Sequence, residues 1–485
     1  MKHKKVVEQE GLSFDDVLLI PRRSSLATRK DARTNTQITK TINIAIPIVS
    51  SNMDTVTESR MAIAMARLGG LGIVHRFMSI EDEVSEVSKV KRTQSIIIEE
   101  PHTIGVNETV TAAQKTMKEW GISGLLVVGS RKGLSGIITS KDTLFIENPS
   151  EAKVSEVMTP RDRLVTAPRD IGIEAARKIL EKHRIEKLPL TDSNGKLCGL
   201  ITSKDIIAKK VLYPHASKDS RGRLLVGGAI GVKDDYLERA QALVEAGCDV
   251  LVLDVAHGHS DQVIAAIKKI KGKFDSDIQL IAGNVATYEG ARELAQAGAD
   301  SLKVGIGPGS ICTTRVVTGC GVPQVTALIE SGRITQEFGV PVISDGGIRT
   351  SGDLTKALAA GASAVMMGSM LAGTEESPGT TIIRNGVRYR ICRGMASLGA
   401  AFGRAQRTGQ EDLEDAHEIV AEGVEALVPY RGKCEEVIWQ LIGGLKSGMS
   451  YCGAKNLKEL QEVARFIKIS RAAYFESLPH DVDRI

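Results

Sequence analysis

The chain has 485 residues, of which 42% are hydrophobic and 25% are charged, and its formal net charge is +4 at pH 7. This length exceeds what one ordinary core supports, so at least two domains are expected. The weak net charge and the lack of a long basic run argue against nucleic acid as a partner. No apolar stretch reaches the roughly 20 residues that a membrane-spanning helix needs, and no signal peptide is visible, so we expect no membrane association.

The first part of the chain alternates apolar runs with helical patterns. Residues 46–50 and 71–74 are apolar, and polar residues follow each run. Between them, Met61 and Met65 lie at helical spacing, and a charged helical pattern covers about residues 80–91. This strand–helix alternation predicts a parallel sheet.

The alternation breaks near residue 96, where an internal repeat begins. Residues 136–142 read Gly-Ile-Ile-Thr-Ser-Lys-Asp, and residues 199–205 read Gly-Leu-Ile-Thr-Ser-Lys-Asp, which is an offset of 63 residues. The repeat divides residues 96–212 into segments of about 96–150 and 155–212. This arrangement resembles a tandem pair of CBS motifs, known as a Bateman module, and we expect it to form an inserted domain.

A Thr-x-x-Asp pattern ends both repeated sequences, at Thr139 and Asp142 and again at Thr202 and Asp205. In a nucleotide site the carboxylate could accept both ribose hydroxyls while the threonine reaches a phosphate. We therefore expect adenine or guanine nucleotides to bind here. A structural alternative exists, because the threonine can also cap the following helix with the aspartate at its third position. Both interpretations can hold together.

After the insert the strand–helix alternation resumes with six further apolar runs. They span residues 224–230, 250–255, 278–282, 301–304, 340–343 and 364–367. Together with the two earlier runs they make eight, and each ends in polar or glycine-rich residues, where (β/α)8 barrels build their active sites. We predict an α/β fold, a TIM barrel formed by residues 1–95 and 213–485. An open doubly wound sheet is the alternative, but no Gly-x-Gly-x-x-Gly follows the first strand.

The most informative stretch is the loop at residues 305–315, which reads Gly-Ile-Gly-Pro-Gly-Ser-Ile-Cys-Thr-Thr-Arg. Its alternate glycines permit positive φ and let the backbone approach a ligand closely. Free amides in such a loop can bind phosphate, and free carbonyls can bind a cation. The charge of Arg315 would favour the thiolate form of Cys312. The alternative is a tight turn with an incidental buried cysteine.

Together with Gly-Val-Pro-Gln at residues 321–324, this loop resembles the active-site loop of the IMP dehydrogenase / GMP reductase family. The resemblance extends from residue 11 almost to the C-terminus. It implies that Cys312 attacks C2 of a purine mononucleotide and that a hydride moves at this carbon. It also implies that Thr314 and Glu422 act with Cys312, although Glu422 could instead be a surface residue of an acidic stretch. A homotetramer is implied too, with octamers formed through the CBS modules as an option.

Polar and glycine-rich strand ends supply the expected nucleotide site. The residues are Ser310, Asp345, Gly346, Gly347, Gly368, Ser369, Gly394, Met395 and Ala396. Loop glycines and Ser310 suit a phosphate late in a barrel, and Asp345 suits the ribose hydroxyls. Taken alone, the Asp-Gly-Gly sequence would be a generic turn.

The resemblance also implies a cofactor and a cation. It places Asp254, Asn284 and Gly305 with a nicotinamide cofactor, NADPH or alternatively NAD. The carbonyls of Gly307, Gly309 and Cys312 resemble the potassium site of the family. His257 and His259 are a single pair without a third ligand, so we expect a hydrogen-bonding or structural role for them. The seven scattered cysteines include no Cys-x-x-Cys zinc pattern and suit a reducing, cytoplasmic environment.

The reaction direction depends on an expected mobile and irregular flap at about residues 377–432. Family dehydrogenases carry an Arg-Tyr pair there that activates water. Counting along the chain from Gly394 leads to Gln410 and Glu411 instead, and no tyrosine lies between Tyr389 and Tyr430.

Two further departures from the dehydrogenase pattern are Ala396 in place of a glycine and Cys392 in place of a tyrosine. Together these differences favour a GMP reductase, which converts GMP and NADPH to IMP, ammonia and NADP. The insert and residues 373–379 look more like those of dehydrogenases. The alternative is therefore an IMP dehydrogenase, which converts IMP, NAD and water to XMP and NADH. A nucleotide-sensing protein with weak or no catalysis is the third hypothesis.

Overall fold

A computed structural model describes residues 6–93, 97–98, 101–129, 133–204, 206–207, 213–233, 235–274, 278–397, 399–400 and 420–479. The chain divides into two compact units. One, here called the barrel unit, contains residues 1–93, 215–217 and 224–485, and the other, the inserted unit, contains residues 94–214 and 218–223. Each unit has its own hydrophobic core.

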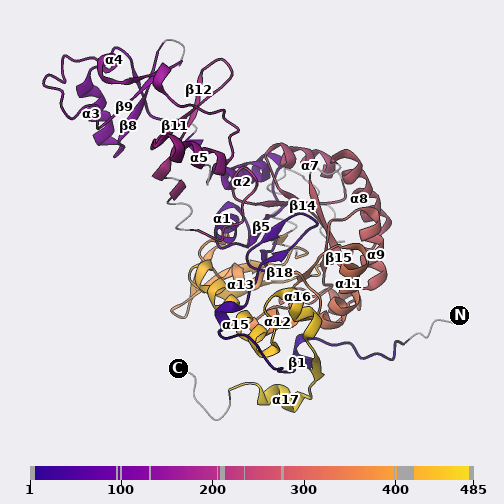
Figure 1. Cartoon of the computed structure of the whole chain (residues 1–485). Helices are drawn as coiled ribbons and strands as arrows, with labels where there is room; N and C mark the ends of the chain where they lie inside the picture. Colours follow the sequence, from indigo (N-terminus) through magenta and orange to yellow (C-terminus); the bar gives the residue numbers. More distant parts are fainter. Residues whose placement is uncertain are drawn as a thin grey trace. The chain divides into compact units, whose positions relative to one another are not determined.

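Eight parallel strands of the barrel unit close into a barrel in the order β13-β14-β15-β16-β17-β18-β4-β5 (Figure 1). They are β4 (Ile48–Ser50), β5 (Leu71–Val74), β13 (Gly227–Ile230), β14 (Val250–Asp254), β15 (Gln279–Val285), β16 (Ser301–Val304), β17 (Val342–Asp345) and β18 (Ala364–Met367). Closure comes from the pairs β18–β4 and β13–β5, which lie on either side of the insert in the sequence. The predicted TIM barrel is thus confirmed, and the open sheet is wrong.

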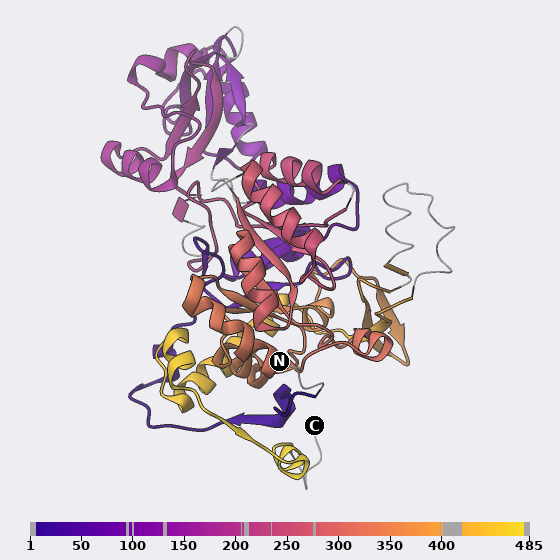
Figure 2. The same cartoon turned by 90° about the vertical axis from the view of Figure 1, so that its right-hand side faces the viewer.

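Helices form a ring outside the strands (Figure 1). The main ones are α1 (Ser59–Arg67), α2 (Ile80–Thr93), α7 (Tyr236–Glu245), α8 (Asp261–Phe274), α9 (Tyr288–Ala297), α11 (Gln324–Phe338), α12 (Ser351–Ala359), α15 (Cys434–Cys452) and α16 (Leu457–Val463). Near the two ends of the described chain, β1 (Val17–Leu19) pairs with β22 (Phe466–Lys468), seen as indigo beside yellow in Figure 2. No helix in the described part of the chain is both long and apolar enough to cross a membrane.

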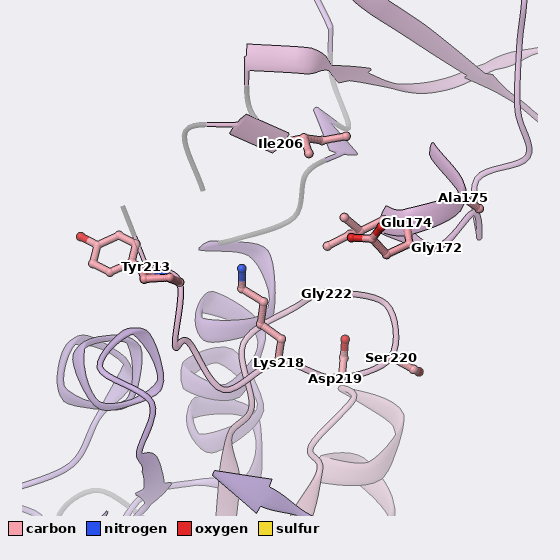
Figure 3. Close-up of a pocket in the computed structure, with 11 residues that line it drawn as sticks. Gly172, Glu174, Ala175, Ile206, Tyr213, Lys218, Asp219, Ser220 and Gly222 are labelled. Carbon is pink, nitrogen blue, oxygen red and sulfur yellow. The ribbon is translucent and has the colours of Figure 1, made fainter. Parts of the chain in front are cut away.

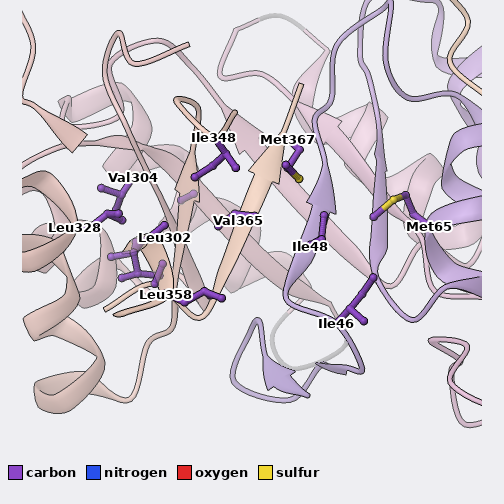
Figure 4. Packing of buried hydrophobic residues seen from close by; sticks show 14 of the residues in the cluster. Ile46, Ile48, Met65, Leu302, Val304, Leu328, Ile348, Leu358, Val365 and Met367 are labelled. Carbon is purple, nitrogen blue, oxygen red and sulfur yellow. The ribbon is translucent and has the colours of Figure 1, made fainter. Parts of the chain in front are cut away.

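Alternation along the strands builds two cores, as a barrel covered by helices requires. On β14, Val250 and Val252 belong to the cluster inside the barrel. Leu251 and Leu253 belong to the larger cluster between strands and helices. Figure 4 shows part of this outer cluster, where Val365 of β18 lies among side chains from neighbouring elements. Both faces of each strand are therefore buried, which explains why the strands read as continuous apolar runs.

The expected irregular flap contains regular structure, which corrects the sequence-based expectation. Strands β19 (Thr381–Arg384), β20 (Val387–Arg393) and β21 (Glu425–Pro429) form an antiparallel sheet. The two-residue turn between β19 and β20 is Asn385-Gly386, with φ of 50° and 75°. Asn-Gly is the strongest short hairpin signal, because both central residues of such a turn need positive φ. Within the expected flap, residues 398 and 401–419 lie outside the described residues.

The inserted unit repeats its elements at the offset found in the sequence. A shift of 63 residues carries α3 (Val110–Glu119), β8 (Gly124–Val128) and β9 (Leu134–Thr139) onto α5 (Ile173–His183), β11 (Lys187–Thr191) and β12 (Leu197–Thr202). In both copies the last two strands form an antiparallel pair. The two small cores match position by position: Ala113, Met117, Leu125, Val127 and Ile138 correspond to Ala176, Leu180, Leu188, Leu190 and Ile201. Each copy is thus one supersecondary unit.

One buried ion pair joins two helices of the barrel ring. Arg239 of α7 donates to Glu83 of α2 at 2.7 Å, and the two side chains are 6% and 0% exposed. We expect Glu83→Ala to lower the free energy of unfolding by roughly 3 kcal/mol, because it leaves a buried guanidinium with Asp235 as its remaining carboxylate partner. Urea denaturation would measure the change. Glu245→Ala, on the exposed side of α7, should change the same quantity by less than about 0.5 kcal/mol.

Candidate active site

The loop after β16 is shaped by close backbone contacts. Gly305 has φ +148°, and a Cβ there would lie 2.2 Å from the carbonyl oxygen of Asp345 on the neighbouring strand β17. Gly307 and Gly321 face the side chain of Arg315, and a Cβ on either would lie within 2.6 Å of its Cγ. The loop therefore needs glycine at these positions for steric reasons.

Arg315 joins the two limbs of this loop. Its Nε donates to the carbonyl of Ile306 at 3.0 Å, and its Nη2 donates to the carbonyl of Val322 at 2.6 Å. Burial lowers the pKa of Arg315, while the charge of Cys312 acts in the opposite direction. The hydrogen bonds of Arg315 thus go to the loop backbone rather than to the sulfur, so Arg315 holds the loop in shape.

Cys312 begins a chain of hydrogen bonds. Its Sγ donates to Thr314 Oγ1 at 3.1 Å, and this hydroxyl donates to Glu422 Oε2 at 2.8 Å. Glu422 lies 108 residues further along the sequence, but its carbonyl accepts the amide of Thr313 at 2.8 Å. Thiol, hydroxyl and carboxylate are thus arranged so that a proton can pass between the sulfur and Glu422.

Residues 394–396 lie against the same segment. The amide of Gly394 donates to the carbonyl of Val424 at 3.0 Å, and the amide of Glu422 donates to the carbonyl of Ala396 at 3.0 Å. Met395 lies in the turn between them. A Cβ on Gly394 would lie 3.3 Å from the carbonyl oxygen of Ile311, next to the cysteine. The structure therefore brings the expected substrate residues 394–396 to the Cys312 loop.

The expected phosphate residues converge on a cavity of about 180 Å³. Ser310, Gly347 and Ser369 line it together, from three different strand ends. Gly346 also lies close, since a Cβ there would be 3.1 Å from the amide nitrogen of Gly309. Gly368 precedes Ser369 at the start of α13 (Ser369–Ala372). Amides, hydroxyls and positive-φ glycines at neighbouring strand ends suit a phosphate.

Polar residues at the ends of β14, β15 and β17 form a network around Lys303. This lysine of β16 contacts Asp254 and Asp345, both at 2.6 Å. Asn284 donates to Asp345 at 2.9 Å and to the carbonyl of Gly305 at 2.7 Å. Of the expected cofactor residues, Asn284 therefore contacts the expected ribose residue Asp345 directly, and Asp254 is joined to it through Lys303. Sequence reasoning missed Lys303, although a lysine within an otherwise apolar strand is a signal that could have revealed it.

His257 and His259 lie near each other, and His259 pairs with a glutamate. His259 Nε2 lies 3.1 Å from Glu293 Oε2, and the rings of His257 and His259 are 6.4 Å apart. In the part of the chain that the structure describes, no group of three or more histidine, cysteine, aspartate or glutamate side chains could hold a metal ion.

We expect the Cys312 loop to tolerate no side chain at Gly305. Gly305→Ala should lower kcat/KM by roughly 100-fold, because displacing reacting groups by about 1 Å has effects of that size. Steady-state kinetics would measure this. Gly319→Ala is the matched control, because Gly319 also has positive φ but its Cβ would meet nothing within 4 Å. An unchanged kcat/KM in Gly305→Ala would contradict the close packing of the loop.

In the inserted unit, the first expected nucleotide motif forms a turn, in which the amide of Asp142 donates to the carbonyl of Thr139 at 3.0 Å. The amide and the hydroxyl of Thr139 both donate to Asp142 Oδ2 at 2.7 Å. In the second copy Thr202 ends β12, and Asp205 lies outside the described residues. The expected helix cap is therefore wrong for the first motif, because residues 140–145 form turns and no described helix begins there. Nucleotide binding stays a prediction.

A cavity of about 390 Å³ lies within the inserted unit (Figure 3). The start of α5, at Gly172 and Glu174, lines one side, and Tyr213 and Lys218 line the other. Lys218 points into the space between them (Figure 3), and burial lowers its pKa. Ile206, which follows the second Thr-x-x-Asp motif, lines the same cavity.

Known proteins of one family match this chain over nearly its whole length. A model of the IMP dehydrogenase / GMP reductase domain matches residues 11–480. Inosine-5'-monophosphate dehydrogenase of Nitrosopumilus maritimus (strain SCM1) is 53% identical over 476 residues, which is 98% of this chain and 99% of that protein. The enzyme of the same name from Aquifex aeolicus (strain VF5) is 52% identical, over 98% of this chain and 96% of that protein.

A solved structure of GMP reductase from Trypanosoma brucei, in complex with guanosine 5'-monophosphate, matches with a TM-score of 0.82 and 45% identity, covering 98% of each chain. Another structure of that reductase, in complex with guanosine 5'-triphosphate, matches with a TM-score of 0.71 and 42% identity, over 95% of this chain and 98% of that one. This chain belongs to the IMP dehydrogenase / GMP reductase family and is an NAD(P)-dependent oxidoreductase of that family.

Proposed function

We propose that this protein is a GMP reductase that acts at C2 of the purine through a covalent intermediate on Cys312. The contact chain from Cys312 through Thr314 to Glu422 carries the proposal. Sγ adds to C2 of GMP, and Thr314 and Glu422 relay protons so that the 2-amino group leaves as ammonia. NADPH, which Asp254, Asn284 and Gly305 would hold, would supply a hydride to C2, and the C–S bond would then break to release IMP and the Cys312 thiol.

The reductase direction is supported because a reductase needs no group that activates water. A dehydrogenase has to hydrolyse its covalent intermediate, which calls for a group that activates water. The sequence has no tyrosine between Tyr389 and Tyr430, so the Arg-Tyr pair expected of a dehydrogenase flap is missing. A reductase expels ammonia instead, and the Glu422 carboxylate with the Thr314 hydroxyl suffices for its proton transfers. The Trypanosoma brucei neighbour bound to guanosine 5'-monophosphate is itself a GMP reductase.

IMP dehydrogenase is the second candidate, and the relatives' names favour it more directly than they favour the reductase. The proteins at 53% and 52% identity are both called inosine-5'-monophosphate dehydrogenase. In that direction Cys312 would add to C2 of IMP, and hydride would leave C2 for NAD. Water would then release XMP, and a group other than an Arg-Tyr pair would have to activate it. A sensing protein with weak catalysis is a poorer fit, because the reactive loop is intact.

Two assays on the same preparation separate these candidates. With GMP and NADPH, we expect absorbance of the reduced nicotinamide to fall while ammonia appears in equal amount. With IMP and NAD, we expect at most a single-turnover burst, since hydride transfer would not be followed by hydrolysis. Steady NADH production from IMP would overturn the reductase and support the dehydrogenase. Absence of both reactions would favour the sensing hypothesis.

We propose a potassium ion at the carbonyls of Gly307, Gly309 and Cys312. Carbonyl oxygens suit such a cation, and the Gly309 carbonyl, which accepts the amide of Cys312 at 3.1 Å, keeps a second lone pair. Exchange of potassium for tetramethylammonium should lower both the thermal midpoint and the turnover. Equal midpoints in the two salts would argue against the site.

We further propose that the inserted unit is a tandem CBS module that binds adenine or guanine nucleotides through Thr139, Asp142, Thr202 and Asp205. The internal repeat and the nearby cavity support this proposal. The solved complex of the Trypanosoma brucei reductase with guanosine 5'-triphosphate supports a guanine nucleotide. Calorimetry with ATP and GTP, on the whole protein and on Thr202→Ala, tests it. Light scattering with and without nucleotide tests the proposed homotetramer and its pairing into octamers.

A further inference from the structure

Lys303 is the most deeply buried cation at the mouth of the barrel. Its side chain is 3% exposed, and its Nζ lies 2.6 Å from Asp254 Oδ1 and 2.6 Å from Asp345 Oδ2. These aspartates end β14 and β17, and Lys303 reaches both from β16. One ammonium group therefore joins the end of β14, which is expected to contact the nicotinamide, to the end of β17, which is expected to bind the ribose.

The remaining contacts leave one carboxylate oxygen for a ligand. Asp254 uses both oxygens, since Lys303 contacts Oδ1 and Asn52 donates to Oδ2 at 2.9 Å. Asp345 receives Lys303 and Asn284 on the same oxygen, Oδ2. None of the described residues donates to Asp345 Oδ1. Oδ1 of Asp345 is therefore available to a ligand. It has two lone pairs, so it can accept hydrogen bonds from both hydroxyls of a ribose.

The charge of Lys303 is needed to hold these groups together. Burial by itself would lower the pKa of Lys303, but the two carboxylates raise it above its ordinary value. Burial would likewise raise the pKa of Asp254, but Lys303 and then Asn52 hold it below its ordinary value. Without the ammonium, the side-chain amides of Asn52 and Asn284 would be the remaining described hydrogen-bond donors to the two carboxylates. Lys303 thus holds the carboxylates of Asp254 and Asp345 in place.

We propose that Lys303 is a positioning residue that builds the nucleotide side and the nicotinamide side of the site as one unit. The inference rests on the proposed function for the roles of Asp345 and Asp254. It assigns to Lys303 no contact with the reacting atoms. Loss of its charge should therefore weaken both ligands together, although each ligand meets a different strand end.

The test uses three variants of the full chain, with Lys303→Gln as a fourth in reserve. Lys303→Met removes the charge at similar length, Lys303→Arg keeps the charge, and Lys271→Met is the matched control. Lys271 contacts Asp300 at 2.9 Å in another lysine–aspartate pair of the same barrel unit, outside the active site. For each variant, calorimetry gives the Kd of GMP and of IMP, kinetics give the KM of the nicotinamide cofactor and kcat, and a thermal scan reports folding.

We expect Lys303→Met to raise the Kd of the nucleotide and the KM of the cofactor at least tenfold. Lys303→Arg should bring both constants back close to those of the unsubstituted protein. Lys271→Met should lower the thermal midpoint without a change in either constant. Lys303→Gln covers the case in which Lys303→Met does not fold, and both constants should again weaken.

The proposal is overturned if Lys303→Met loses thermal stability while both constants stay within twofold, or if only one ligand is weakened. Calorimetry uses GMP and IMP without turnover, so it is independent of the reaction direction. A wrong choice between reductase and dehydrogenase would therefore leave the nucleotide prediction standing and would appear only in the turnover assays.

Discussion

Cys312→Ala is expected to abolish turnover in both reaction directions, with a loss on the order of 10⁴-fold or more in kcat. Each candidate reaction passes through a bond between Sγ and C2, and no other described group at the site can replace the thiol as nucleophile. Calorimetric binding of GMP or IMP should persist, because Ser310, Gly347 and Ser369 still line the cavity expected to hold the phosphate. The measurement is multiple turnover at high enzyme concentration, with thermal scans to verify folding.

Cys320→Ala is the control for this experiment, since Cys320 is an exposed thiol on the same loop segment. Its kcat and KM should stay within about twofold of the unsubstituted protein, as is usual for surface substitutions. Turnover that survives in Cys312→Ala, or that vanishes in Cys320→Ala, would mean that a different group forms the covalent bond.

Glu422→Gln is expected to lower kcat by roughly 10²- to 10³-fold, the usual range for loss of a positioned acid or base. The amide can still accept the hydrogen bond of Thr314, but it cannot take up or return a proton. Thr314→Val should have a comparable effect, because it cuts the same chain between Cys312 and Glu422. The proposed relay includes both residues. The kcat of the double variant should therefore fall by no more than about the larger of the two single decreases.

Glu425→Gln provides the matched comparison, three residues further along the same segment. Glu425 is 43% exposed and pairs with Arg393 at 3.3 Å, so its loss should change kcat by no more than about twofold. Additive losses in the Thr314→Val, Glu422→Gln pair would show that the two residues act separately, and an unaffected Glu422→Gln would remove Glu422 from the relay. Steady-state kinetics across pH would report which step has changed.

The barrel could be predicted from the sequence because its strands are short apolar runs, each followed by glycine or polar residues. Burial on both faces erases the usual alternation but leaves an apolar run that is easily found. The internal repeat was equally visible, since similar sequences at a fixed offset fold into similar units. The Asn385-Gly386 sequence is a hairpin turn signal, but the expectation of an irregular flap does not include the hairpin that the structure forms there.

The sequence by itself thus contains the local features of the site. They are a cysteine in a glycine-rich loop, aspartates and glycines at strand ends, and a flap without an Arg-Tyr pair. What only the tertiary structure decided is which of these groups meet. Glu422 reaches Thr314 across 108 residues, and Lys303 reaches Asp254 and Asp345 from a strand that reads as apolar. Contacts of this kind depend on how a closed barrel brings its strand ends to one mouth, and a linear pattern contains the residues but not the distances between them.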